Sequence, residues 1–136
     1  MRFIRQVVVF DAADVATESA FWGALLDGRV IDDDERFHVV IDGAGHWRIG
    51  VQHAPDHVPP DWPDGSPQQV HLDLHVDDGP TAHERAVALG ATVLQTGDFS
   101  ADHGHTVLAD PAGHPFCVGW GQPDEERLQR FLATLE

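Results

Sequence analysis

Three polar side chains recur at every second position of the segment 70–76, where His71, Asp73 and His75 are separated by leucines. Side chains on a β-strand point to opposite faces in turn, so these three polar groups would share one face. The imidazole of His71 is a competent ligand for zinc, iron, nickel or manganese. Oriented by a carboxylate such as that of Asp73, the same imidazole is also a candidate general base.

Two further side chains are candidates for the same kind of chemistry. In the segment 47–53, Trp47, Ile49 and Val51 form an apolar face, so Gln52 is the neutral candidate ligand on the other face. Cys117 is the chain's only cysteine, and its thiol is either a zinc ligand or a small packed apolar group. A single cysteine excludes an internal disulfide and fits a reducing cytoplasm, where we expect the protein.

Composition and missing motifs exclude several classes of function. The chain has no phosphate-binding glycine loop, no CxxC pair and no GxSxG elbow, which argues against nucleotide, redox and serine-hydrolase chemistry. Its 136 residues carry a formal net charge of -15, with no lysine, which argues against nucleic-acid binding. An acidic surface favours solubility and a cationic ligand. No apolar run approaches the roughly 20 residues of a membrane span.

The elements that would position these residues follow one order twice. Apolar periodicity and turn residues predict a strand, a helix and three strands in each half, separated by a proline-rich connector. The first set lies at 3–10, 15–26, 29–32, 37–42 and 47–53, and the second at 70–76, 80–89, 91–97, 105–109 and 115–120. A helix over 124–135 completes the chain.

The two halves also share residues, which indicates an internal duplication. The segment 39–46 aligns with 107–114 without a gap, and both contain Asp, Ala, Gly and His at the same relative places. We therefore expect His46 and His114 to take part in hydrogen bonding of matching turns. Extended further, the ungapped alignment sets Ile49 opposite Cys117, whereas strand alternation requires a shift of one residue.

Several of these segments resemble the vicinal oxygen chelate superfamily, the glyoxalase/bleomycin-resistance/dioxygenase type. The resemblance rests on residues 110–117, which are similar to that superfamily's last β-hairpin, on 70–78 and on 89–91. The Pro-Asp-Trp-Pro linker at 60–63 is similar to the glyoxalase-like branch. The resemblance implies an α+β domain of two βαβββ modules around a small-molecule cavity. Its expected parts are module one at 1–54, a linker at 55–68, module two at 69–122 and a C-terminal helix at 123–136.

The resemblance also implies where a metal would be held. His71 stands at a ligand position of the second module, Gln6 at the matching position of the first, and Gln52 is the third candidate ligand. Cys117 stands where metal-using members carry glutamate, so the ligand set is degraded and the usual proton-shuttling base is missing. If a divalent ion is bound, the expected ligands are His71, Gln6 and Gln52.

Three functions remain open on this evidence. The first is a metal-free protein that binds a small organic molecule, and the residues expected around it are Gln6, Gln52, His75, Trp62 and Cys117. The second is a lyase, isomerase or dioxygenase that depends on a divalent metal. The third is a metal-independent enzyme in which His71 is the general base. We also expect a homodimer, because Phe131, Leu132 and Leu135 give the C-terminal helix an apolar surface.

Overall fold

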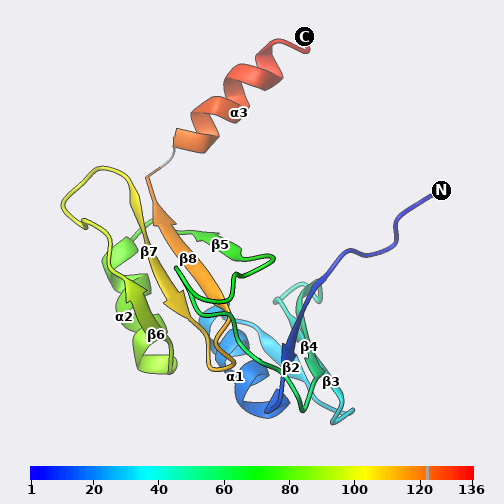
Figure 1. The fold of residues 1–136 in the computed structure, drawn as a ribbon. Coiled ribbons are helices and arrows are strands. Elements are labelled where there is room, and N and C mark those ends of the chain that lie inside the picture. Colours follow the sequence, from blue (N-terminus) through cyan, green and yellow to red (C-terminus); the bar gives the residue numbers. More distant parts are fainter. Residues whose placement is uncertain (122) are drawn as a thin grey trace.

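The computed structural model describes residues 1–121 and 123–136, and it contains the duplicated order of elements (Figure 1). Module one consists of β1 (Val8–Ala12), α1 (Val15–Leu25), β2 (Arg29–Ile31), β3 (Phe37–Ile41) and β4 (Trp47–His53). Module two consists of β5 (Leu72–His75), α2 (Gly79–Leu89), β6 (Thr92–Gln95), β7 (Gly104–Ala109) and β8 (Pro115–Trp120). The helix α3 (Pro123–Ala133) follows. The predicted α+β fold of two βαβββ modules is therefore confirmed.

Each module forms one mixed four-stranded sheet. Sheet A has the strand order β1-β4-β3-β2, and sheet B has the order β5-β8-β7-β6. The first and last strands of each module run parallel, whereas the other neighbours are antiparallel. No helix among the described residues is long and apolar enough to cross a membrane.

The first strand begins later than its sequence predicts. The apolar run 3–10 predicted a strand that includes Gln6, but β1 starts at Val8, which lies opposite Ile49 of β4. Phe3 and Ile4 are strongly exposed. Hydrophobicity alone therefore extended the prediction beyond the residues that pair with β4.

Both modules begin their helix with the same cap. Asp14 accepts a hydrogen bond from the backbone N–H of Thr17 and another from its hydroxyl, at 3.0 and 2.6 Å. Asp78 accepts the same pair from Thr81, at 3.1 and 2.8 Å. Each aspartate satisfies backbone donors that the first helical turn leaves free. α2 ends at Gly90, whose φ of 118° only glycine adopts readily.

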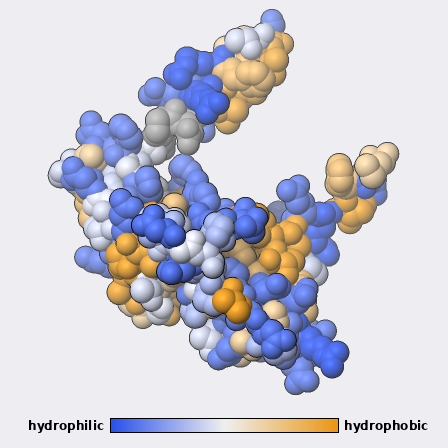
Figure 2. All heavy atoms as spheres, in the orientation of Figure 1, coloured by the Kyte–Doolittle hydropathy of each residue, from blue (hydrophilic) through white to orange (hydrophobic). Residues whose placement is uncertain are grey.

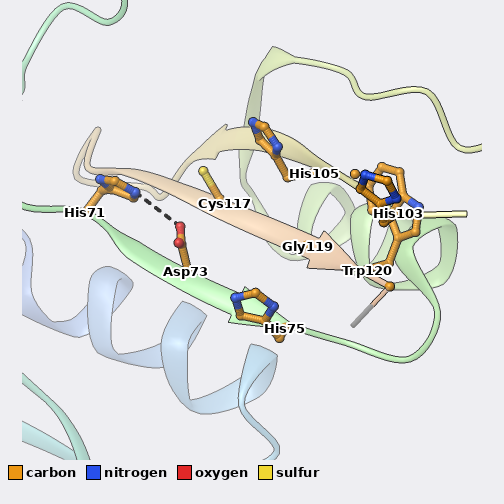
Figure 3. Close-up of a pocket in the computed structure, with 10 residues that line it drawn as sticks. His71, Asp73, His75, His103, His105, Cys117, Gly119 and Trp120 are labelled. Atoms are coloured by element: carbon orange, nitrogen blue, oxygen red, sulfur yellow. Dashed lines mark ion pairs between the residues drawn. The ribbon is translucent and has the colours of Figure 1, made fainter. Parts of the chain in front are cut away.

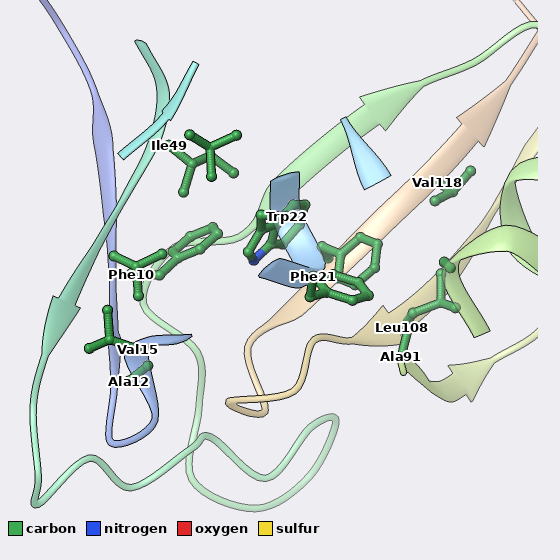
Figure 4. Packing of buried hydrophobic residues seen from close by; sticks show 13 residues of the cluster. Phe10, Ala12, Val15, Phe21, Trp22, Ile49, Ala91, Leu108 and Val118 are labelled. Atoms are coloured by element: carbon green, nitrogen blue, oxygen red, sulfur yellow. The ribbon is translucent and has the colours of Figure 1, made fainter. Parts of the chain in front are cut away.

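The hydrophobic core joins the two modules (Figure 4). Trp22 of α1 is fully buried, and its ring lies 5.4 Å from Phe10 of β1 and 5.0 Å from Phe116 of β8. Phe21 packs against both Trp22 and Phe116. Because α1 contributes the large aromatic side chains, it fills the space between the sheets.

Two buried carboxyl groups lie beside this aromatic cluster. The indole Nε1–H of Trp22 donates to Oε1 of Glu18 and to Oδ2 of Asp110, both at 3.0 Å. The backbone N–H of Ala112 donates to Oε2 of Glu18 at 2.9 Å. Burial raises the pKa of Glu18 to about 9, and the neighbouring Asp110 adds to the effect. A proton is therefore retained on the pair at neutral pH, and the network ties α1 to the β7–β8 turn.

The matching turns are held in the same way, as the sequence predicted. Oδ1 of Asp42 accepts from the backbone N–H groups of Ala44 and His46, each at 2.9 Å. Oδ1 of Asp110 accepts from Ala112 and His114, at 3.1 and 2.9 Å. The two turns thus conserve the hydrogen bonds that the shared Asp, Ala, Gly and His residues predicted.

Candidate functional site

The polar residues of module two gather on the face of sheet B that is turned away from the hydrophobic core. Asp73 of β5 pairs with Cys117 of β8, and His75 pairs with Gly119. His105 of β7 pairs with Gly119 from the other side. Cross-strand partners share a face, so the predicted alternation on β5 is confirmed. A cavity of about 380 Å³ lies over this face and is lined by His71, Asp73, His75, His103, Gly104, His105, Cys117, Gly119, Trp120 and Gly121 (Figure 3).

One end of the cavity holds an imidazole, a carboxylate and a thiol. Nε2 of His71 lies 3.2 Å from Oδ1 of Asp73, and the two side chains are 42% and 55% exposed. Nδ1 of His71 lies 3.5 Å from Nε2 of Gln68. With Nε2 donating to Asp73, Nδ1 is the acceptor for the Gln68 amide. His71 is thereby held between a carboxylate and an amide.

The thiol of Cys117 is in its neutral form. Burial raises its pKa to about 11, and the negative charge and hydrogen bonding of Asp73 contribute further. A reactive cysteine needs surroundings that stabilise the thiolate, and this environment does the opposite. The geometry therefore favours a packed thiol beside Asp73 over a nucleophile.

Imidazoles occupy the other end of the cavity. His75 and His105 lie on either side of Gly119, and His103 lies beyond them (Figure 3). A Cβ on Gly119 would lie 3.7 Å from Nδ1 of His75, so the glycine leaves open space between the rings. His103 and His105 were not among the candidate site residues selected from the sequence, although they stand near a predicted hairpin from which one of them could reach the cavity. Their place in the cavity depends on the pairing of β7 with β8, which has no local signal.

Strand register identifies the counterparts of these residues in module one. Val39 pairs with Gly50, and Gly50 pairs with Val9. Val107 of module two pairs with Cys117. Because Val39 and Val107 are equivalent in the duplication, Gly50 is the counterpart of Cys117. The expected shift of one residue is therefore present.

A β-bulge is the physical cause of that shift. In β3 and β4, Val40 pairs with Ile49 but Ile41 pairs with Trp47, so Arg48 is an extra residue. The corresponding pairs of module two run without a bulge. An extra residue in one strand displaces every later side chain by one position relative to the ungapped alignment.

The same register places Gln6 one residue from the counterpart of His71 and Gln52 two residues from the counterpart of Cys117. Val9 is the counterpart of Asp73, so Val7 is the counterpart of His71, one residue from Gln6. Gln52 is exposed on β4, where it pairs with Asp11 and Phe37. Neither glutamine is among the residues that line the cavity on sheet B. Trp62, half-buried in the linker, is not among them either.

A metal would find a different set of donors from the predicted one. A nitrogen of His71, an oxygen of Asp73 and the sulfur of Cys117 all lie within 4.8 Å of one another. Imidazole, carboxylate and thiolate are the donor types that zinc accepts. Glu18, Asp110 and His114 are also close together, but both carboxyl groups are already hydrogen-bonded to Trp22 and to backbone N–H groups. A metal ion would therefore be held better by His71, Asp73 and Cys117 on sheet B, and these three donors all belong to module two.

The comparisons with known proteins agree with this architecture. The family model described as glyoxalase-like domain matches residues 7–119. No curated protein matches the chain.

Solved structures with the same architecture include the fosfomycin resistance protein FosX from Mesorhizobium loti, with a TM-score of 0.67 and 17% identity, covering 94% of this chain and 99% of that one. A glyoxalase/bleomycin resistance protein/dioxygenase family enzyme from Burkholderia phytofirmans PsJN has a TM-score of 0.65 and 18% identity, covering 84% and 95%. TioX from Micromonospora sp. ML1 has a TM-score of 0.59 and 16% identity, covering 87% and 98%. At these identities the likeness shows the fold alone.

Proposed function

Because the chain belongs to the glyoxalase-like domain family of the vicinal oxygen chelate superfamily, we propose that it binds a small organic molecule on sheet B without a metal ion. The ligand would lie in the cavity between His71 and His105. The fold alone does not select this function, because members of one fold carry out different chemistry. The residues at the cavity must therefore carry the argument.

The proposal rests on the two residues of module one that correspond to His71 and Cys117. Val7 and Gly50 stand where His71 and Cys117 stand in module two. Neither a valine side chain nor a glycine offers a metal donor. A metal shared between the first and last strands of both modules would therefore lose half of its ligands.

The lining of the cavity favours a ligand with a positive charge. Asp73 is the acidic side chain among the lining residues, and neither Arg nor Lys is among those that the structure describes there. The chain as a whole carries a formal net charge of -15, which attracts cations at long range. The four imidazoles add hydrogen-bond donors and acceptors for the polar groups of the same ligand.

The experiment combines metal analysis with ligand screening on protein purified without chelators or a histidine tag. We expect less than stoichiometric metal, and a rise in melting temperature with small organic cations. A ligand at roughly 100 times its Kd stabilises a protein by about 2.7 kcal/mol. Asp73→Asn should abolish the shift, whereas Asp11→Asn, at the position of module one that corresponds to His75, should retain it. Stoichiometric metal that Asp73→Asn removes would overturn the proposal.

A second candidate is a divalent-metal-dependent lyase, isomerase or dioxygenase. It is favoured by the convergence of His71, Asp73 and Cys117 within 4.8 Å. A metal at these residues would supply Lewis-acid chemistry to a ligand oxygen. The same metal analysis separates this candidate from the first.

A third candidate is a metal-independent enzyme with His71 as general base. The 3.2 Å contact between Nε2 of His71 and Asp73 fixes the ring, and Nδ1 would be the basic nitrogen once the Gln68 amide, 3.5 Å away, gives way to the ligand. Turnover by the metal-free protein that His71→Gln removes, without loss of ligand binding, would favour this candidate.

We also propose that the protein forms a homodimer. The apolar side chains of α3 are exposed, with Leu128 at 46% and Phe131 at 58%. Exposed apolar surface of this kind marks interaction sites in soluble proteins. Static light scattering at micromolar concentration should give twice the mass of the chain, and a monomer would contradict this proposal.

A further inference from the structure

The helix α3 presents an apolar ridge that has no cover in the described part of the chain. Leu128, Phe131 and Leu132 of the helix are followed at helical spacing by Leu135, just after its end, and the four are 43% to 67% exposed. In Figure 1 the helix extends away from both sheets. An isolated helix of 11 residues is marginally stable in water, so its stability depends on packing of an apolar face.

A second apolar surface lies at the other end of the chain. Residues 1–7 are extended and precede β1, and we call them the arm. Phe3 and Ile4 of the arm are 84% and 77% exposed, and Val8 and Val9 at the start of β1 are also exposed. Figure 2 shows apolar atoms on both the arm and α3, on two separate projections of the molecule.

The charges beside the two surfaces are opposite. Arg2 and Arg5 bracket Phe3 and Ile4, and the guanidinium of Arg5 lies 3.9 Å from the ring centroid of Trp47. Residues 123–136 hold four acidic residues against Arg127 and Arg130, so this end of the chain is net negative. Glu125 and Glu126 in the first turn of α3 are exposed, and Glu126 also pairs with Arg130 at 3.8 Å. Glutamates on the helix and arginines on the arm would therefore attract each other when the apolar residues meet.

We propose that α3 of one protomer packs on the arm and the start of β1 of a second copy of the chain. This inference rests on the proposed homodimer and names the surfaces that form it. The arm and α3 leave the domain on the same side in Figure 1 yet stay apart within one chain. A twofold axis would bring each helix onto the partner's arm, so that the same contact forms twice.

The lone cysteine permits a direct test. Two proteins are made in a Cys117→Ser background, one with Phe3→Cys and one with Leu132→Cys, so that each chain has a single thiol. A disulfide between the two proteins can then form only between chains. We expect mild oxidation of the mixture to give mainly the mixed disulfide, identified by mass spectrometry. Val93→Cys on β6, which is 38% exposed against 84% for Phe3 and lies outside the proposed surface, replaces Phe3→Cys in the control and should give little mixed product.

Charge exchange provides a second readout in the natural background. Arg2→Glu with Arg5→Glu should weaken dimerisation at least tenfold, and Glu125→Arg with Glu126→Arg in the same chain should restore it. If the protein is a dimer but gives neither the mixed disulfide nor this rescue, the proposed contact between α3 and the arm is wrong, although the proposed homodimer is right. A monomer by light scattering would overturn both.

Discussion

Module one and module two share a scaffold but differ on the face that is turned away from the core. The position opposite Val39 is Gly50, and the position opposite Val107 is Cys117. The neighbouring first strand contributes Val9 in one case and Asp73 in the other. The two modules therefore share their strand order, whereas the cluster of an imidazole, a carboxylate and a thiol occurs in module two.

The helices also differ, but here module one carries the large buried side chains and module two carries alanines. The equivalent caps Asp14 and Asp78 align Trp22 of α1 with Ala86 of α2. They also align Glu18 with Ala82. Module one thus supplies the large buried groups that hold the modules together, whereas module two supplies the cavity. One copy became structural and the other became the candidate site.

Some contacts persist even where their residues have changed places. In module one, Oγ of Ser19 on α1 lies 2.7 Å from Nδ1 of His38 on β3. In module two, the helix carries the histidine and the strand the hydroxyl, with Nδ1 of His83 3.1 Å from Oγ1 of Thr106. The duplicate thus retains a hydroxyl–imidazole bridge between helix and sheet with its partners exchanged.

The largest expected difference between the modules concerns their helices. Trp22→Ala should destabilise the protein by about 3–5 kcal/mol, because it leaves a cavity and removes the donor to two buried carboxyl groups. The counterpart Ala86→Gly should cost only about 1 kcal/mol, from helix propensity. Urea unfolding measures both. Equal losses would contradict the division of roles.

The buried acid pair should make stability fall as pH rises. The pKa of Glu18 is raised to about 9 in the folded protein from its ordinary 4.5, so the stabilising protonated form is complete below pH 4.5 and is lost towards pH 9. The slope is at most about 1.4 kcal/mol per pH unit. Urea unfolding between pH 5 and 9 tests this.

Asp110→Asn should flatten that dependence, because the neighbouring negative charge is removed. Asp42→Asn is the matched control in module one, where the turn has no buried glutamate beside it. A pH profile of the natural protein that is flat between 5 and 9 would show that Glu18 is ionised in the fold.

Substitutions at the corresponding positions Gly50 and Cys117 should lower stability by moderate amounts. In Gly50→Cys, the new Cβ would lie 2.8 Å from Cζ of Phe37 and 3.1 Å from Cγ2 of Val9, so a cost of about 1–3 kcal/mol is expected. Cys117→Ser should cost about 1 kcal/mol, because the hydroxyl can donate to Asp73, and should change stability more than ligand binding. Chemical denaturation and ligand titration separate the two. Loss of binding in a folded Cys117→Ser protein would contradict the packed-thiol interpretation.

The smallest effects are expected at the helix caps, where the modules are alike. Asp14→Ala and Asp78→Ala each remove hydrogen bonds to the N–H and hydroxyl of a threonine three residues later. The two variants should lower the melting temperature by a few degrees and by similar amounts. A large difference between the two losses would mean that the caps, although alike in geometry, contribute unequally to stability.

Local patterns were sufficient to predict what depends on neighbouring residues. The shared Asp, Ala, Gly and His residues predicted both turns, and alternation predicted the common face of His71, Asp73 and His75. The start of β1 at Val8 depends on long-range pairing, so hydrophobicity could not locate it. Alternation predicted the shift of one residue in β4, but only the pairing with β3 identifies Arg48 as the extra residue. The contact between Glu18 and the β7–β8 turn joins residues 94 positions apart and likewise leaves no local signal.

The raised pKa of Cys117 also determines how the cavity withstands its chemical surroundings. With a pKa of about 11, roughly one thiol in 10,000 is ionised at pH 7, and only the thiolate reacts rapidly with alkylating agents and peroxides. Iodoacetamide should therefore modify the native protein far more slowly than the urea-unfolded chain. Oxidation of the sulfur beside Asp73 by peroxide should be slow in the native protein for the same reason.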